Sequence, residues 1–134
     1  MLGLIMKNVI GVHISLGDAL DRLSILSVKL SHFSDDPHKQ QVLSDMINTF
    51  TDCLRESGHD LSNNLDYMSC LTKINYSLWD YEDAIRLSIK KGQDYETAYI
   101  AKRIVVMNDR RAKIKIFIDK KNSSPIYDFK IYRK

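Results

Sequence analysis

Apolar residues recur at intervals of three and four along most of the chain, which is the spacing of one face of an α-helix. The first stripe begins directly after Ser15, a residue that favours the N-cap position. The second begins after Asp36, where Pro37 takes the first helical position, and it stops near Gly58. The stripes of these two predicted helices are Leu16, Leu20, Leu23, Leu26, Leu30 and Phe33, and then Val42, Met46, Phe50 and Cys53.

Two further stripes follow a polar, turn-rich segment over residues 58–64. One of them ends at Gly92, and the other starts with Asp94 as its predicted cap and ends before Asn122. The connection over residues 91–94 is so short that the two helices must form a long antiparallel hairpin. The stripes of these two helices are Tyr67, Leu71, Ile74, Leu78, Ile85 and Ile89, and then Ile100, Ile104, Met107, Ile114 and Ile118.

The two ends of the chain have a different pattern, in which β-branched and aromatic residues alternate roughly with polar ones. We expect short β-strands over residues 9–14 and 126–132, which pair with each other or with another subunit. The predicted fold is a single, mainly α-helical domain over residues 1–134, with about four helices and short strands at the N- and C-termini. Residues 1–14 form a strand or an extension in this prediction, and residues 123–134 form a strand tail.

Composition narrows the class of protein. A chain of 134 residues, 44% of them hydrophobic, is one domain with enough apolar side chains for a core. Its 20 Lys and Arg against 17 Asp and Glu give a net charge of +3, which does not indicate a dedicated nucleic-acid binder. Cys53 and Cys70 have no CxxC motif and no histidine at ligand spacing, so we predict no disulfide framework, no metal site and a reducing cytoplasm. The apolar segment over residues 1–14 is short, so we expect neither a signal peptide nor a membrane span there.

Arg111 is the candidate residue with the most informative position. It follows Met107 by four residues and precedes Ile114 by three, so it projects from the stripe that should face the core. A buried guanidinium needs a carboxylate or an anionic ligand, because an unpaired charge there would be costly. We expect the first helix to bring Asp18 or Asp21 to it. Two interpretations stay open: an ion-pair network that joins three helices, or a pocket that awaits an anion.

The register of the hairpin predicts further neighbours. If the chain turns around Gln93, Asn75 lies level with Arg111, and Asp83 lies level with Arg103. We therefore predict an internal ion pair between Arg103 and Asp83.

Three blocks of sequence together resemble a known family. They are GDALDRLSILSVK at residues 17–29, LWDYEDAIR at 78–86 and NDRRAKIK at 108–115. They are similar to a family of small helical proteins of unknown function, found in tailed phages and near glycosyltransferase genes in bacteria. That family usually has glutamate where this chain has Asp18, and lysine where it has Arg22, and both differences conserve charge. The resemblance implies one constellation made of Asp21, Arg22, Lys29, Trp79, Glu82, Asp83, Asn108, Asp109, Arg110 and Arg111.

We predict a noncatalytic binding protein for a small anionic ligand, a nucleotide or a cyclic nucleotide signal. Guanidinium groups offer the forked donors that phosphate oxygens accept, and an aromatic ring suits a nucleobase. The phage setting implied by the resemblance favours a sponge that sequesters an immune signal in the cytoplasm of an infected bacterial host. No catalytic residue, metal or cofactor is expected. The predicted ligand-binding residues are Asp21, Arg22, Lys29, Trp79, Asp83, Asn108, Arg110 and Arg111.

Other functions remain open at this point. Two carboxylate pairs at i, i+3, Asp18 with Asp21 and Asp80 with Asp83, lie on separate predicted helices, and Asp109 lies on a third. Such carboxylates could hold Mg²⁺, as in all-α nucleotide pyrophosphohydrolases. The chain could also be a structural or interaction protein. Residues 102–121 hold eight Lys or Arg and two acids, which is compatible with nonspecific nucleic-acid binding but is more typical of a solvated helix face.

Apolar residues off the main stripes predict self-association. Ile25 and Val28 in the first helix, and Val105 and Ile116 in the fourth, need cover in addition to the terminal strands. We therefore expect a homo-oligomer.

Overall fold

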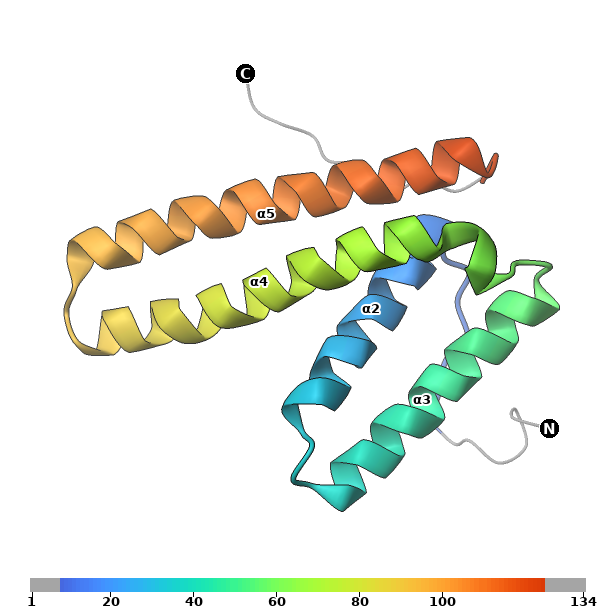
Figure 1. The fold of residues 1–134 in the computed structure, drawn as a ribbon, viewed down its shortest axis with the longest axis horizontal. Helices are drawn as coiled ribbons and strands as arrows, with labels where there is room; N and C mark the ends of the chain where they lie inside the picture. The colour runs from blue at the N-terminus through green and yellow to red at the C-terminus, as the bar shows by residue number, and fades with distance from the viewer. Residues whose placement is uncertain (1–7, 125–134) are drawn as a thin grey trace.

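The computed structural model of the chain describes residues 8–124 and is mainly helical there (Figure 1). In chain order it contains α2 (Leu16–His32), α3 (Pro37–Glu56), the short 3₁₀ helix η1 (Leu61–Asn64), α4 (Leu65–Lys90) and α5 (Asp94–Lys121). The predicted four helices and the long antiparallel hairpin of α4 and α5 are confirmed.

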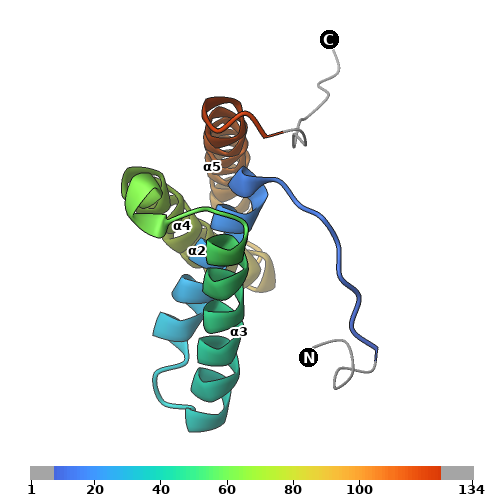
Figure 2. The same cartoon turned by 90° about the vertical axis from the view of Figure 1, so that its right-hand side faces the viewer.

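The predicted N-terminal strand is not formed. Residues 9–14 run without regular secondary structure beside the helices (Figure 2). A strand needs a neighbouring strand to accept its backbone hydrogen bonds, and residues 8–124 contain none. The strand predicted over residues 126–132 lies outside the described residues.

Local capping chemistry explains where the first two helices begin. The side chain of Ser15 accepts a hydrogen bond from the Asp18 backbone N–H at 3.0 Å, and Asp36 does the same for Lys39 at 3.1 Å. Both caps were predicted from the sequence, and both are confirmed. Gly58 and Gly92 have φ values of +82° and +68°, a backbone conformation that glycine adopts without a steric penalty. These glycines follow the ends of α3 and α4.

The predicted cap of the last helix was wrong by one residue. The carbonyl oxygen of Gln93 accepts the backbone N–H of Thr97, so Gln93 is the cap residue and Asp94 is already helical. Asp94 instead lies in the first turn, where a negative charge interacts favourably with the helix dipole.

The core surrounds α2, which packs against α3 on one side and against the α4–α5 hairpin on the other (Figures 1 and 2). Because α2 has neighbours on several sides, Val28 is buried within the chain although it lies off the main stripe. The main core cluster consists of Leu16, Ala19, Leu20, Leu23, Leu54, Leu71 and Ile118.

The predicted core face of α3 was partly wrong: Phe50 packs against the core cluster as predicted, but the other three predicted positions do not. Leu43 and Leu54 are buried in α3, whereas Val42 and Met46 are each 44% exposed and Cys53 is exposed. Two stripes with three-and-four spacing share Phe50, and their other positions lie one residue apart, which is about 100° of rotation. Packing against α2 selects the more apolar of the two stripes.

The α4–α5 hairpin extends well beyond the end of α2 (Figure 1). α2 therefore packs against only one part of the hairpin, and polar and charged side chains of α2 and α5 meet Asn75 of α4 there. Within residues 8–124, no helix combines the length and apolar character needed to cross a membrane.

Candidate functional site

A buried polar network lies where α2 crosses the hairpin. Asp21 of α2 is only 3% exposed, and Asn75 of α4 is also buried. The Asn75 amide donates to Asp21 Oδ1 at 3.0 Å and to Ser24 Oγ at 2.7 Å, while Ser24 donates to the Asp21 carbonyl oxygen at 2.6 Å. Each buried polar group therefore has a partner, which satisfies the main requirement for burying it.

Two cations from α5 complete this network. Arg111 Nη1 donates to Asn75 Oδ1 at 3.0 Å, and Arg111 Nε lies 3.7 Å from Asp21 Oδ2. One turn further along, Lys115 Nζ lies 3.1 Å from Asp18 Oδ1 and 3.9 Å from Asp21 Oδ2. The predicted approach of α2 carboxylates to Arg111 is confirmed. The predicted position of Asn75 level with Arg111 is confirmed as well. The network joins three helices.

Asp18 shows the electrostatic effect of this arrangement. Partial burial by itself raises the pKa of Asp18, but hydrogen bonds from Arg22 and Lys115, together with their positive charges, outweigh it. The pKa of Asp18 therefore lies below its ordinary value. Arg22 Nε reaches the other carboxylate oxygen of Asp18 at 3.0 Å.

The start of α2 also touches the end of α5. The backbone N–H of Gly17 donates to Asp119 Oδ1 at 2.6 Å, and Asp119 is fully buried. A Cβ at position 17 would collide with the Lys115 carbonyl oxygen and lie 2.9 Å from Asp119 Oδ1. Only glycine allows this close approach, which sets the position of α2 against α5. Asp119 Oδ2 has no hydrogen-bond partner among the residues that the structure describes.

A pocket of about 470 Å³ opens beside the network, and we call it the hairpin pocket. Its apolar wall includes Ile25 and Val28 of α2 and Leu78 of α4. Its polar lining is Asn75, Trp79, Glu82, Asp83, Arg86, Asn108 and Arg111.

Arg111 lies at the inner side of the hairpin pocket, with its side chain 29% exposed. A guanidinium has five N–H donors, and Arg111 uses one of them, on Nη1, for the buried Asn75. Its contacts with Asn75 and Asp21 engage Nη1 and Nε. Arg111 is therefore held from behind while donors remain for a ligand.

The rim of the hairpin pocket is mixed in charge. Arg86 lies 3.8 Å from Glu82 and 3.9 Å from Asp83, and all three side chains are exposed. Trp79 is half-buried, with the His32 ring stacked on it at 4.4 Å between centroids and the Phe33 ring edge-on at 6.2 Å. His32 and Phe33, both at the end of α2, thus hold the indole in place at the pocket wall.

The structure brings together some of the eight predicted ligand-binding residues and not others. Trp79, Asp83, Asn108 and Arg111 line the hairpin pocket, and Asp21 lies buried behind Arg111. The remaining three, Arg22, Lys29 and Arg110, are exposed and outside its lining.

The predicted ion pair of Arg103 with Asp83 was wrong. Arg103 Nε donates to the Tyr81 hydroxyl at 3.4 Å, and Asp83 pairs instead with Arg86 one turn along its own helix. Asp83 lines the hairpin pocket together with residues of α2, whereas Tyr81 of the same helix reaches Arg103. Side chains at the same height of two antiparallel helices come into contact only if both point into the interface between the helices.

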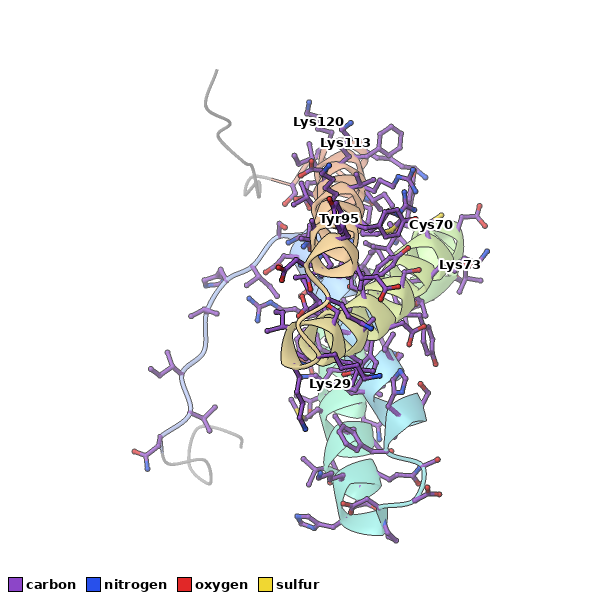
Figure 3. All side chains as sticks on the ribbon, turned by 90° about the vertical axis from the view of Figure 1, so that its left-hand side faces the viewer. Lys29, Cys70, Lys73, Tyr95, Lys113 and Lys120 are labelled. Carbon is purple, nitrogen blue, oxygen red and sulfur yellow. The ribbon has the colours of Figure 1, made fainter. Side chains whose placement is uncertain are left out.

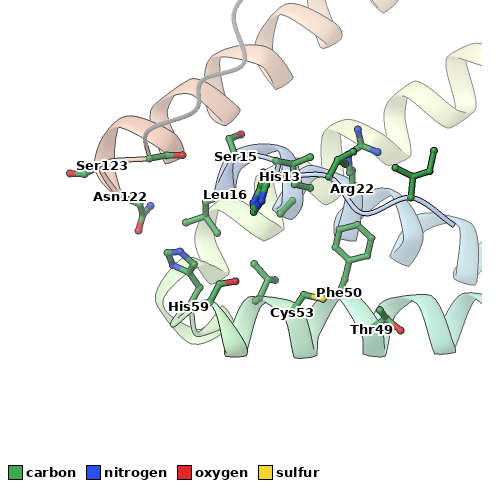
Figure 4. Close-up of a pocket in the computed structure, with 17 residues that line it drawn as sticks. His13, Ser15, Leu16, Arg22, Thr49, Phe50, Cys53, His59, Asn122 and Ser123 are labelled. Atoms are coloured by element: carbon green, nitrogen blue, oxygen red, sulfur yellow. The ribbon is translucent and has the colours of Figure 1, made fainter. Parts of the chain in front are cut away.

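A second cavity, of about 610 Å³, lies between the segment before α2, α3 and the end of α5 (Figure 4). His13, Phe50, Cys53 and Asn122 come to it from these three parts of the chain. Arg22 also lines this cavity, so the shared face of Arg22 and Lys29 does not lead to the hairpin pocket. Among residues 8–124, no group of three or more His, Cys, Asp or Glu side chains is arranged to hold a metal ion.

Sequence reasoning missed three parts of this site. Ser24 was not singled out, although its position three residues after Asp21 places both on one face of α2. Lys115 carries the same signal, because it follows Arg111 by four residues. The contact of Gly17 with Asp119 joins positions that are 102 residues apart and has no local signal.

Comparison with protein families matches residues 10–134 to a family described as a family of unknown function (DUF6165). The match covers the three blocks on which the resemblance rests. No curated protein and no solved structure matches the chain. The chain belongs to the family of unknown function DUF6165.

Proposed function

We propose that this protein binds a small anionic ligand in the hairpin pocket without transforming it. The observation that carries the proposal is the position of Arg111, which is held from behind by buried Asn75 and offers its remaining donors to the pocket. A cation already oriented in this way binds an anion without first losing side-chain freedom.

A nucleotide or a cyclic nucleotide is the ligand that fits this lining best. The forked guanidinium of Arg111 matches two oxygens of one phosphate. The fixed ring of Trp79 suits contact with a flat base, and the Asn108 amide can both donate and accept. The carboxylates of Glu82 and Asp83 at the rim can accept from ribose hydroxyls or an exocyclic amine. The volume of about 470 Å³ lies in the usual range for small-molecule sites.

The charge of the lining supports one anionic group on the ligand, and not a polyphosphate. Arg86 is already close to Glu82 and Asp83, so Arg111 is the cation whose donors face the pocket. The carboxylate that balances Arg111 is Asp21, behind it. A cyclic mononucleotide or a cyclic dinucleotide, with one negative charge on each phosphate, suits this balance better than ATP does.

The cations that contact Asp18 and Asp21 favour binding over magnesium-dependent hydrolysis. Asp18 and Asp21, the first pair proposed for Mg²⁺, are each in contact with Lys115, and Asp21 also faces Arg111. These cations occupy the oxygens that a metal would need, and their charge opposes it. The sponge role, with the phage setting and the host cytoplasm, belongs to this proposal, because a protein that retains a signal nucleotide intact removes it from its receptor.

The test is incubation with a panel of mononucleotides, cyclic mononucleotides and cyclic dinucleotides, with and without Mg²⁺, followed by heat release and chromatography. We expect an intact nucleotide to be recovered from the protein. We also expect Arg111→Gln to weaken its binding by about tenfold or more, as for the loss of one charge-assisted contact. Arg22→Gln, at the other cavity, removes the same charge and should bind like the wild type.

Three results would contradict the proposal. Loss of the nucleotide only with Mg²⁺ would indicate the pyrophosphohydrolase. Retention of no nucleotide would favour a purely structural network, and so would an Arg111→Gln protein that is strongly destabilised but binds normally.

A further inference from the structure

The outward face of α5 carries a continuous stripe of aromatic and basic side chains. At about 100° per residue, positions 95, 99, 102, 106, 110, 113, 117 and 120 fall within roughly 80° of one another around the helix. Tyr95 is 96% exposed, Tyr99 is 63% exposed and Phe117 is 59% exposed. The outer stripe, as we call it, consists of Tyr95, Tyr99, Lys102, Val106, Arg110, Lys113, Phe117 and Lys120.

Folding separates the charges of α5 in a way that composition does not show. Of the two acids in residues 102–121, Asp119 is fully buried against Gly17, and half-buried Asp109 lies about 20° beyond the edge of the outer stripe. Two of the cations, Arg111 and Lys115, turn inward to the α2 carboxylates. The outer stripe keeps four cations and no acid. Lys113 and Lys120 project from the outer edge of α5, with Tyr95 at its near end (Figure 3).

Aromatic and basic side chains continue to alternate on the flank of α4 next to this stripe. The rings of Phe117 and Tyr67 lie 5.8 Å apart, and Lys121 Nζ lies 4.9 Å from the centre of the Tyr67 ring. The Arg103 guanidinium donates to Tyr81. Neighbouring side chains thus hold the rings of Tyr67, Phe117 and Tyr81 beside the basic residues of α5.

We propose that the outer stripe of α5 binds single-stranded nucleic acid without sequence preference. Such binding combines cations along the phosphate backbone with aromatic rings on which bases stack, and the outer stripe supplies both. From Tyr95 to Lys120 it is about 38 Å long at 1.5 Å per residue, enough for several nucleotides. The hairpin pocket is on the other side of α5, where Asn108 and Arg111 point, so this surface is separate from the proposed small-ligand site.

A membrane surface fits the same residues less well. Helices that lie in a bilayer interface carry their apolar and basic residues on opposite faces, so that the apolar face is immersed. In the outer stripe the two kinds of side chain are interleaved along one line, and the rings Tyr95 and Tyr99 carry hydroxyl groups. Bases and phosphates also alternate along a strand, which matches the interleaving.

The first test measures fluorescence anisotropy of a labelled 12-nucleotide oligo-dT with the full chain over a range of salt concentrations. The variant Lys102→Gln/Lys113→Gln is compared with Lys39→Gln/Arg55→Gln on α3, and both lower the net charge from +3 to +1. We expect about a tenfold or greater loss of affinity at low salt for the first variant only. Its slope of log affinity against log salt should also fall by about 1.4, or 0.7 for each phosphate contact. Equal losses in both variants would overturn the proposal.

The second test separates stacking from charge at Tyr99. Tyr99→Ala should weaken oligonucleotide binding by about fivefold to a hundredfold, whereas Tyr99→Phe keeps the ring and should bind like the wild type. Equal behaviour of the two variants would contradict stacking. Vesicles of phosphatidylserine and phosphatidylcholine are assayed in parallel, and binding to these vesicles without binding to the oligonucleotide would overturn the proposal in favour of a membrane.

The proposals for the outer stripe and for the hairpin pocket can be tested independently of each other. Arg111→Gln should leave oligonucleotide binding unchanged, because Arg111 points away from the outer stripe. Loss of oligonucleotide binding in this variant, with its helical circular dichroism intact, would contradict the assignment to the outer stripe. The three stripe positions changed here, Tyr99, Lys102 and Lys113, are exposed, so the variants should fold.

Discussion

Replacing Asp21 with asparagine tests whether the polar network stabilises the fold. The change removes one negative charge and keeps the shape of the side chain. Deleting one partner of a buried ion pair costs about 3–5 kcal/mol when the other charge is left without compensation. Here the remaining cations keep other contacts, because Lys115 stays 3.1 Å from Asp18 and the Arg111 side chain is partly exposed. We therefore expect the free energy of unfolding to fall by about 2–3 kcal/mol.

Urea unfolding followed by circular dichroism measures this loss as a shift of the midpoint at constant slope. In a domain of this size the melting temperature should fall by roughly 6–12 °C. Asp83→Asn is the matched control, because Asp83 is 68% exposed and its pair with Arg86 spans 3.9 Å. The control should change stability by less than about 0.5 kcal/mol. An Asp21→Asn protein as stable as this control would refute the argument that the network holds the three helices together.

Three further predictions follow from particular contacts. Gly17→Ala should destabilise the protein by about 1–3 kcal/mol or more in urea unfolding, because the added Cβ meets the backbone of α5, and a wild-type midpoint would contradict the close approach. Leu43→Ala should cost about 2–5 kcal/mol and Val42→Ala less than about 1 kcal/mol in melting experiments, and the reverse order would restore the sequence-based face of α3. The folded-state pKa of Asp18 lies below its ordinary value of 3.8, so its contribution to stability is present above that pH and is lost as pH falls through the lower folded value. Acid unfolding of Asp18→Asn should therefore depend less steeply on pH between about 5 and 2 than that of the wild type, and parallel curves would show that Asp18 contributes nothing.

Features of the fold that depend on neighbours in sequence were predictable. The caps at Ser15 and Asp36 and the turn at Gly92 are set within a few residues, so local chemistry determines them. The approach of Asp21 to Arg111 was also predictable, because a charge on a core-facing stripe requires a partner and only α2 was left to provide it.

Features that depend on which element packs where were not predictable. The face of α3 was undecided by spacing, since Val42 and Leu43 each begin a stripe, and the position of α2 selects Leu43. Val28 was expected to need cover from another subunit, yet α2 is central and the chain itself buries it. Val28 therefore no longer supports the predicted homo-oligomer. Val105 is 59% exposed and still does.

Only half of the predicted ligand-binding residues line the hairpin pocket. Helical spacing predicts which residues share a face of one helix, but not which other helix packs against that face. Arg22 and Lys29 share a face of α2, as predicted, but that face turns away from the hairpin pocket. Arg110 and Arg111 are neighbours in sequence and point in different directions, one outward and one to Asn75. A dense run of charge therefore serves separate surfaces once it is wound into a helix.

The two interpretations of Arg111, a structural ion pair and a ligand-binding residue, are compatible in this geometry. An anion bound to Arg111 would weaken the interaction of the guanidinium with Asp21. A buried Asp21 carboxylate without a compensating positive charge would then oppose binding. Asp21 keeps the Asn75 amide at 3.0 Å and Lys115 at 3.9 Å, so it retains both a donor and a positive charge when Arg111 turns to a ligand. Under the proposed function, Lys115 would let the donors of Arg111 turn to a ligand at a small cost to the stability of the fold. Ligand binding should then raise the melting temperature of the wild type by mass action, and Lys115→Met should reduce that gain although Lys115 is outside the pocket lining.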